Sequence, residues 1–257
     1  MFIPVNDAQL FATKYGPQDA KAILGIGGWI GSSELWVDPF SVLSQHWATI
    51  AYDHRGSGAS VSPTSSITYD NLIADVFAVL DAFGVQRCAL AAESAGALTA
   101  IGAALAHPER ISHLIIVDGM YHRSITSEQD IFLKGLQTAY APTLEKFIQL
   151  CVPEPDCEHI KAWGRQIIGR ALPEAAIALR LLGSELDIRS KISSIQQPTL
   201  VIHGDQDKIV PMERAKELAS ALPRAELLVL EGAGHVPTLT RPKDVATAIA
   251  SFLRRFP

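Results

Sequence analysis

The chain has 257 residues, of which 48% are hydrophobic and 19% are charged, and its net charge is −5. This length and composition are typical of one globular domain with a large buried core, and they exclude a disordered protein. There is no block of basic residues, so neither nucleic acid nor an anionic membrane is an expected partner.

The N-terminal segment and the cysteines predict a cytoplasmic protein. The first residues, Met1 to Asp7, lack a basic segment followed by a long apolar stretch, so no signal peptide is expected. The three cysteines have no CxxC spacing and are expected to be free thiols, with a Cys151–Cys157 disulfide as the alternative.

Six apolar segments alternate with amphipathic segments along the chain, which predicts a doubly wound, mostly parallel sheet of about eight strands with helices on both faces. Two earlier segments, 2–5 and 9–14, are expected to form an antiparallel hairpin at the edge of this sheet. The six predicted strands are Ala22–Ile26, Ala48–Tyr52, Cys88–Ala92, Leu114–Val117, Leu200–His203 and Glu226–Leu230.

Two of the predicted helices have a clear period. One carries Leu72, Val76 and Val79 on one face and is expected to stop at Gly84. The other is the last helix of the chain, with apolar residues at 245, 248, 249, 252 and 253.

The alternation breaks between residues 121 and 197, where no strand is predicted. Four helical segments separated by prolines fit this interval instead. We therefore expect a helical lid at 121–197, inserted between two strands of a core formed by 1–120 and 198–257. The four predicted lid helices are 128–140, 143–151, 159–169 and 174–182.

Ser94 is the candidate nucleophile. It follows a predicted strand and opens a helix, with the small residues Ala92 and Gly96 on either side. A tight strand-to-helix turn of this kind is a nucleophile elbow, which lifts the serine hydroxyl above the sheet. A helix N-cap without chemistry is the alternative interpretation of Ser94.

His235 is the candidate base, because a serine hydroxyl needs one at neutral pH. Gly232 and Gly234 give its loop room to approach another part of the chain closely. The other histidines are expected within strands or turns, or, like His122, at the surface or at helix ends.

Two aspartates, Asp205 and Asp207, follow the strand that ends at His203, and either could orient His235. A turn or cap is the alternative role for each. Asp118, after the preceding strand, is a third candidate.

With these motifs in the order Ser94, Asp207, His235, the chain resembles the α/β-hydrolase superfamily over nearly its whole length, in its lidded, esterase-like branch. The acid of that family stands in a G-x-x-D-x-x-x-P stretch, which here selects Asp207. Its oxyanion loop corresponds to Gly27-Gly28-Trp29, so the resemblance assigns the backbone N–H groups of Trp29 and Ala95 as oxyanion donors. The chain departs from the family pattern at Ala92 and Gly27, which are usually glycine and histidine.

Two further motifs carry less weight. The turn Asp53-His54-Arg55-Gly56 is a marker of the same family, and we interpret it as structural, with Arg55 connecting loops. The glycines at 25, 27 and 28 lack the full dinucleotide fingerprint.

No histidine or cysteine spacing indicates a metal site, so neither a metal nor another cofactor is expected. Trp163, Arg165 and Arg170 of the lid could touch substrate, but they are more typical of packing or solvent-facing positions.

The sequence therefore predicts a serine hydrolase that cleaves a small or medium carboxylic ester, a lactone or a related acyl bond without a cofactor. Its partner would be a small-molecule substrate, and the protein a monomer or a small homo-oligomer. The same triad also fits carbon–carbon bond hydrolysis and cofactor-free perhydrolysis, and a hydrolase-like binding protein is the non-enzymatic alternative.

Overall fold

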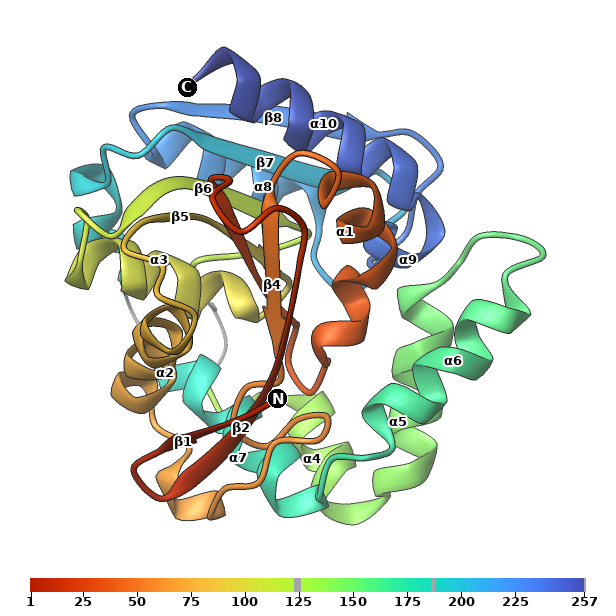
Figure 1. Cartoon of the computed structure of the whole chain (residues 1–257). Helices are drawn as coiled ribbons and strands as arrows, with labels where there is room; N and C mark the ends of the chain where they lie inside the picture. Colours follow the sequence, from red (N-terminus) through yellow and green to blue (C-terminus); the bar gives the residue numbers. More distant parts are fainter. Residues whose placement is uncertain (123–125, 186–187, 257) are drawn as a thin grey trace.

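The computed structural model describes residues 1–122, 126–185 and 188–256. Its centre is one sheet of eight strands (Figure 1). The strands are β1 Phe2–Val5, β2 Ala8–Tyr15, β3 Ala22–Ile26, β4 Ala48–Tyr52, β5 Cys88–Glu93, β6 Ile111–Val117, β7 Thr199–Gly204 and β8 Ala225–Leu230.

The strand order is β1-β2-β4-β3-β5-β6-β7-β8. In this order the six strands from β4 to β8 are parallel to one another, whereas β2 pairs antiparallel with both β4 and β1 and so forms an antiparallel edge. The predicted fold class is thus confirmed. Because β3 pairs with both β4 and β5, the direction of winding reverses at β3, and ligands bind at the carboxyl ends of strands beside such a switch point.

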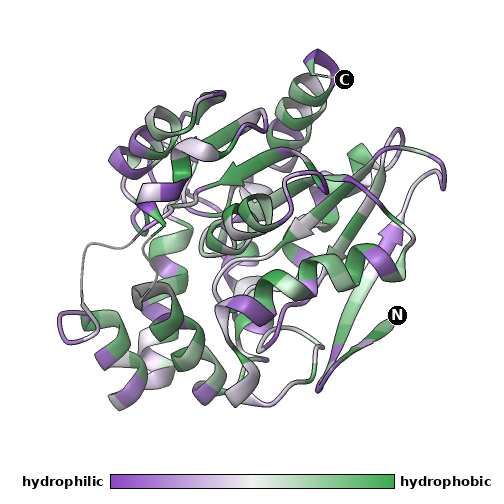
Figure 2. Cartoon of the chain, turned by 90° about the vertical axis from the view of Figure 1, so that its left-hand side faces the viewer, coloured by the Kyte–Doolittle hydropathy of each residue, from purple (hydrophilic) through white to green (hydrophobic). Residues whose placement is uncertain are grey.

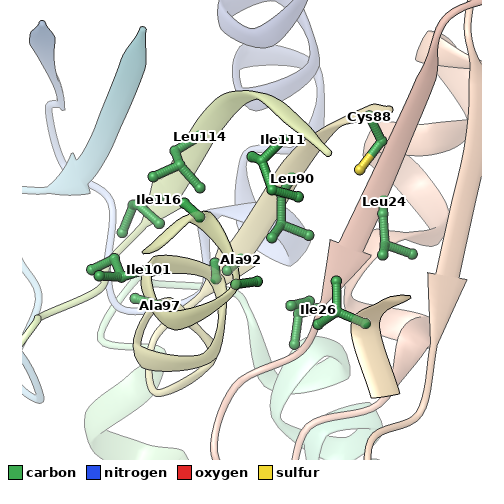
Figure 3. Close-up of a cluster of buried hydrophobic side chains, with 14 of the residues drawn as sticks. Leu24, Ile26, Cys88, Leu90, Ala92, Ala97, Ile101, Ile111, Leu114 and Ile116 are labelled. Carbon is green, nitrogen blue, oxygen red and sulfur yellow. The ribbon is translucent and has the colours of Figure 1, made fainter. Parts of the chain in front are cut away.

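Helices cover both faces of the sheet (Figure 1). The face covered by α2 Tyr69–Ala82, α3 Gly96–Ala106 and α8 Met212–Ala221 carries the larger apolar core. Figure 3 shows part of that core, where side chains of β3, β5 and β6 such as Leu24, Leu90 and Ile116 lie beside Ala97 and Ile101 of α3. The opposite face packs against α1 Val37–Leu43 and α10 Pro242–Arg255, with the short α9 Pro237–Thr240 nearby.

The ends of α2 follow from its sequence. Thr68 caps the start, its Oγ1 accepting a hydrogen bond from the Asn71 N–H. Gly84 has φ +69°, and beyond it the Val85 N–H donates to the Leu80 carbonyl at 2.9 Å, which closes the helix in a Schellman motif. The predicted stop at Gly84 is therefore confirmed.

Four helices lie between β6 and β7, beyond the carboxyl edge of the sheet (Figure 1). They are α4 Ile131–Thr138, α5 Tyr140–Cys151, α6 Glu158–Ile168 and α7 Pro173–Glu185. Their buried side chains form an apolar cluster of their own with Trp29 and Ile30. Figure 2 shows this amphipathic pattern, with hydrophobic and polar residues on different sides of the helices and hydrophobic strands inside.

Some elements differ from prediction. The helices α1 and α8 were not among the predicted elements. Strand β6 begins at Ile111 rather than Leu114, because Ile111 pairs with Cys88 before the register shifts between Cys88 and Ala89. Three short 3₁₀ helices complete the fold, at Ser33–Trp36, Thr64–Ser66 and Arg189–Ser194. The three cysteines are free. Of the helices in the described ranges, none has the length and apolarity needed to cross a bilayer.

Candidate active site

The turn after β5 holds Ser94 in a strained conformation. Ser94 has φ +52°, a region that costs a residue with a side chain about 1–3 kcal/mol. Its N–H donates to the Val117 carbonyl at 2.8 Å, which holds the turn against β6. A Cβ at Gly96 would lie 2.4 Å from the Gly27 oxygen, so only glycine fits two residues after the serine. These contacts set the position of the Ser94 hydroxyl.

The loop after β8 brings His235 to this hydroxyl. The His235 N–H donates to the Cys151 carbonyl of α5 at 2.8 Å, so the helical segment between β6 and β7 holds the loop as well. The ring Nε2 lies 2.8 Å from the Ser94 Oγ, and Nδ1 lies 2.7 Å from Asp207 Oδ2. Three residues far apart in the sequence thus form one hydrogen-bonded chain at the carboxyl edge.

Asp207 and Asp205 have different partners. Asp207 Oδ2 faces the imidazole, and its Oδ1 accepts hydrogen bonds from the N–H groups of Ile209 and Val210. Asp205 Oδ1 accepts a hydrogen bond from the Gly232 N–H at 2.7 Å. The turn role considered for either aspartate belongs to Asp207, which makes the turn bonds, whereas Asp205 connects its loop to the histidine loop.

Burial and charge act in opposite directions on His235 and Asp207. Burial lowers the pKa of His235, but the neighbouring Asp207 carboxylate outweighs it and raises the pKa to about 9. Burial raises the pKa of Asp207, but the charge of His235 and the bonds to its ring and to the Val210 and Ile209 N–H groups bring the pKa below its ordinary value. The pair therefore favours a carboxylate that stabilises a positively charged imidazole, as an acyl-transfer base requires.

Two backbone N–H groups flank Ser94. In the ranges that the structure describes, the N–H groups of Trp29 and Ala95 donate no hydrogen bond to the protein. Gly28 brings the loop close, since a Cβ there would lie 3.2 Å from the Ser94 Cβ. These groups are thus available to a developing oxyanion beside the hydroxyl.

Comparison with known proteins identifies the family of the chain. A hydrolase family model described as serine aminopeptidase, S33, matches residues 19–239. The chain belongs to this family of α/β-hydrolases. It is 27% identical over 255 residues to a Pseudomonas syringae pv. syringae protein that carries the name Putative carbamate hydrolase RutD, covering 93% of this chain and 96% of that one. It is 29% identical over 234 residues to the pimeloyl-[acyl-carrier protein] methyl ester esterase of Nitrosomonas europaea, covering 84% and 89%.

Solved structures share the fold of this hydrolase. The enol-lactonase of Burkholderia xenovorans LB400 superposes with a TM-score of 0.90 at 22% identity, covering 99% of this chain and all of that one. An esterase of Exiguobacterium antarcticum gives a TM-score of 0.91 at 20% identity, covering 98% of each chain. These structures show that the architecture is that of known hydrolases, and the family match shows that the chain is an enzyme of the serine-hydrolase type.

A small cavity of about 70 Å³ adjoins Ser94 in this hydrolase. We call it the apolar chamber, because most of its wall consists of hydrophobic side chains, contributed by α5, α6, α9, the 3₁₀ helix Ser33–Trp36 and neighbouring loops. These include Leu35, Phe147, Ile148, Ile160, Ile167 and Leu239, and the chamber also touches Ser94, His235 and Glu93.

Glu93 is a site residue that the sequence analysis missed. Its side chain is buried beside Ser94, and its Oε2 accepts a hydrogen bond from Thr238 Oγ1 at 2.6 Å. Burial raises the pKa of Glu93 to about 7, against the opposing effect of the Thr238 bond and the charge of His235. The available signal was an acidic residue directly after an entirely apolar strand.

His54 is another missed contact. Its Nε2 lies 2.9 Å from the Gly28 oxygen, in the loop that carries Trp29. The neighbouring Arg55 connects loops as predicted: it is buried, it pairs with Asp75 and Asp7, and it donates to Ser66. The family turn thus supports the loop opposite Ser94.

Roles were also predicted from the sequence for His122 and for three residues of the helical segment between β6 and β7. Trp163 packs among the hydrophobic residues, and Arg165 and Arg170 pair with Glu145 and Glu34, so none of the three lines the apolar chamber. The surface position expected for His122 is wrong, because that residue is only 8% exposed.

Asp118 does not orient His235. Its Oδ1 accepts a bond from the Gly204 N–H at 2.9 Å and lies 3.3 Å from His203 Nδ1. Side-chain atoms of Asp118, His203 and Asp207 lie within 4.8 Å of one another, a spacing that a metal ion could use. Burial raises the pKa of Asp118 well above its usual range, so this carboxyl favours its neutral form, and Asp207 already faces His235. A neutral carboxyl and a carboxylate that already faces His235 are poor cation ligands, so these groups do not fit a cation site.

Proposed function

We propose that this hydrolase is a serine esterase that cleaves a small or medium carboxylic ester, or a related acyl bond such as a lactone, with Ser94, His235 and Asp207. The observation that carries the proposal is the hydrogen-bonded chain from Ser94 Oγ through His235 to Asp207, at 2.8 and 2.7 Å. The two available N–H groups beside Ser94 support it.

The geometry suits a two-step acyl transfer. His235 Nε2 takes the proton of Ser94 as Oγ attacks the carbonyl carbon, and the N–H groups of Trp29 and Ala95 bind the oxyanion. The imidazolium then gives that proton to the departing alkoxide, which leaves as an alcohol. In the second step water loses a proton to His235 and attacks the acyl-enzyme, releasing the acid and restoring Ser94.

Asp207 supports both steps. By accepting the Nδ1 proton, it keeps Nε2 free to act as the base and stabilises the imidazolium. Each oxyanion donor of this kind contributes roughly 3–4 kcal/mol to the transition state. We further propose that residues 121–197 form a lid that selects substrates, since two of their helices, α5 and α6, form part of the wall of the apolar chamber.

The curated relatives have names that include a carbamate hydrolase and a methyl ester esterase, both of which attack a carbonyl that bears an oxygen substituent. The apolar chamber favours an ester with a short alkyl group over a charged leaving group. A panel of ethyl and p-nitrophenyl esters, run beside a lactone and an alkyl carbamate, ranks these substrates directly.

The decisive test is covalent labelling at Ser94. After treatment with a fluorophosphonate, intact-mass analysis should show one adduct, and peptide mapping should place it on Ser94. Ser94→Ala should remain unlabelled and lose about 10⁴- to 10⁶-fold in kcat. Ser41→Ala, a change at an exposed serine of α1, is the matched control and should label normally. An adduct on Ser94→Ala would overturn the assignment.

A further inference from the structure

A second cavity, of about 370 Å³, opens on another side of Ser94. Its wall includes Trp29, Ser94 and Ala95, so a substrate carbonyl at the serine would lie between this cavity and the apolar chamber. Three basic side chains also line it: His122, Arg180 and Arg214. Among the described lining residues there is no acid, and we call this cavity the basic chamber.

The two arginines are held in place by carboxylates outside the wall. Arg180 of α7 donates through Nε and Nη2 to the buried Asp130, at 2.6 and 2.9 Å, and its guanidinium stacks on the Phe132 ring at 4.8 Å. Arg214 of α8 pairs with Glu217 at 2.8 Å. Both side chains are thus oriented without a ligand, which lowers the entropy lost on binding one.

Polar groups in this chamber still lack partners. In the described part of the chain, Arg180 Nη1 has no acceptor, and the buried Nδ1 of His122 has no hydrogen-bond partner. A buried polar atom without a partner is unfavourable unless a ligand or water satisfies it. Since each guanidinium already faces one carboxylate, the chamber suits a singly charged anion rather than a doubly charged one.

The position of His235 indicates which chamber holds the alkoxy group of the ester and which holds its acyl chain. His235 must deliver a proton to the leaving oxygen, and it lines the apolar chamber but not the basic one. The alkoxy group therefore belongs in the apolar chamber, whose 70 Å³ accommodate only a short alkyl chain. The acyl chain extends into the basic chamber.

We infer that the enzyme hydrolyses short-alkyl monoesters of dicarboxylic acids, with the free carboxylate of the acyl chain bound by Arg214, Arg180 and His122. A carboxylate accepts two parallel N–H bonds from a guanidinium, which fixes the chain length as well as the charge. This inference rests on the proposed esterase function and adds its substrate class.

The test compares two esters of equal chain length. Monoethyl adipate carries the carboxylate, and ethyl hexanoate does not. The ratio of their kcat/KM values should favour the monoester in the unmodified enzyme, and Arg214→Gln should lower that ratio about tenfold or more, because hydrogen bonds to charged groups are stronger than neutral ones. Arg214→Lys should recover part of it. Arg170→Gln removes a charge from a residue that lines neither chamber and should leave the ratio unchanged.

Two further measurements keep the inference falsifiable if a variant folds poorly. Free adipate should inhibit hydrolysis of ethyl butyrate by the unmodified enzyme competitively, and adipamide should not. Sodium 6-acetoxyhexanoate, which carries its carboxylate on the alcohol side, should be a poor substrate. Turnover of ethyl hexanoate without any preference for the monoester would overturn the substrate class alone. Absence of turnover with every ester would overturn the esterase function and the substrate class with it.

Discussion

The buried carboxyl of Glu93 should make the free energy of unfolding depend on pH in a way that one substitution removes. Burial raises its pKa from 4.5 to about 7 in the folded protein. One pKa unit corresponds to about 1.4 kcal/mol, so the shift amounts to about 3 kcal/mol. A pKa that is higher in the folded state gives stability that is fully present below pH 4.5, and that is lost as the pH rises through the folded value near 7.

Glu93→Gln removes this titration but keeps an oxygen that can accept the Thr238 hydrogen bond. The variant should be close to the unmodified protein in stability near pH 4.5. As the pH rises, the free energy of unfolding of the variant should become larger than that of the unmodified protein, by about 3 kcal/mol above pH 7. Urea unfolding between pH 4.5 and 8, followed by circular dichroism, measures this difference at each pH.

A matched control is Glu231→Gln, at an exposed position in the turn after β8. It should show no comparable change in relative stability across the same pH range. If Glu93→Gln differs from the unmodified protein by the same amount at pH 5 and pH 8, Glu93 is already ionised in the folded state and the argument from burial is wrong.

The remaining predictions concern the catalytic groups and the lid. Asp207→Asn should lower kcat about 10⁴-fold, because it allows the wrong imidazole tautomer. Asp205→Ala should instead cost about 1 kcal/mol of stability through the lost Gly232 bond, as urea unfolding would show, and turnover should largely persist. Since neutral His235 is the base and its pKa is raised to about 9, kcat/KM should rise with pH through an ionisation well above 6.5; a flat profile from pH 5 to 9 would contradict this. Lid substitutions such as Phe147→Ala should change the relative kcat/KM of different acyl chains, rather than lower all of them by one factor.

The sheet could be predicted from the sequence because its strands are buried on both faces and therefore appear as continuous apolar runs. The segments β3 and β4 have the predicted bounds for this reason. By contrast, α1 has only seven residues and α8 only ten, so too few turns are present for a helical period to stand out from a loop.

The three candidate catalytic residues could be predicted because each follows a strand, and the carboxyl ends of parallel strands lie at one edge of the sheet. These residues are Ser94, His235 and Asp207. Their hydrogen-bond distances and the two roles of Asp207 depend on loop geometry, which no local pattern encodes.

The basic chamber could not be predicted for a different reason. His122, Arg180 and Arg214 come from three separate elements, and nothing in their local sequence distinguishes them from surface residues. Only the packing of the helical segment on the sheet brings them to one cavity. The same packing buries His122, against expectation.

Trp29 connects the loop beside Ser94 to the helical segment between β6 and β7. Its indole Nε1 donates to the Ala176 carbonyl of α7 at 2.8 Å, and its ring lies against Phe132 and Phe147 of the helical segment. Its backbone N–H is the proposed oxyanion donor on the other side. A displacement of α7 that breaks the indole hydrogen bond should therefore also displace the loop beside Ser94. The contact between Trp29 and α7 therefore supports the catalytic loop as well as the packing of the helical segment.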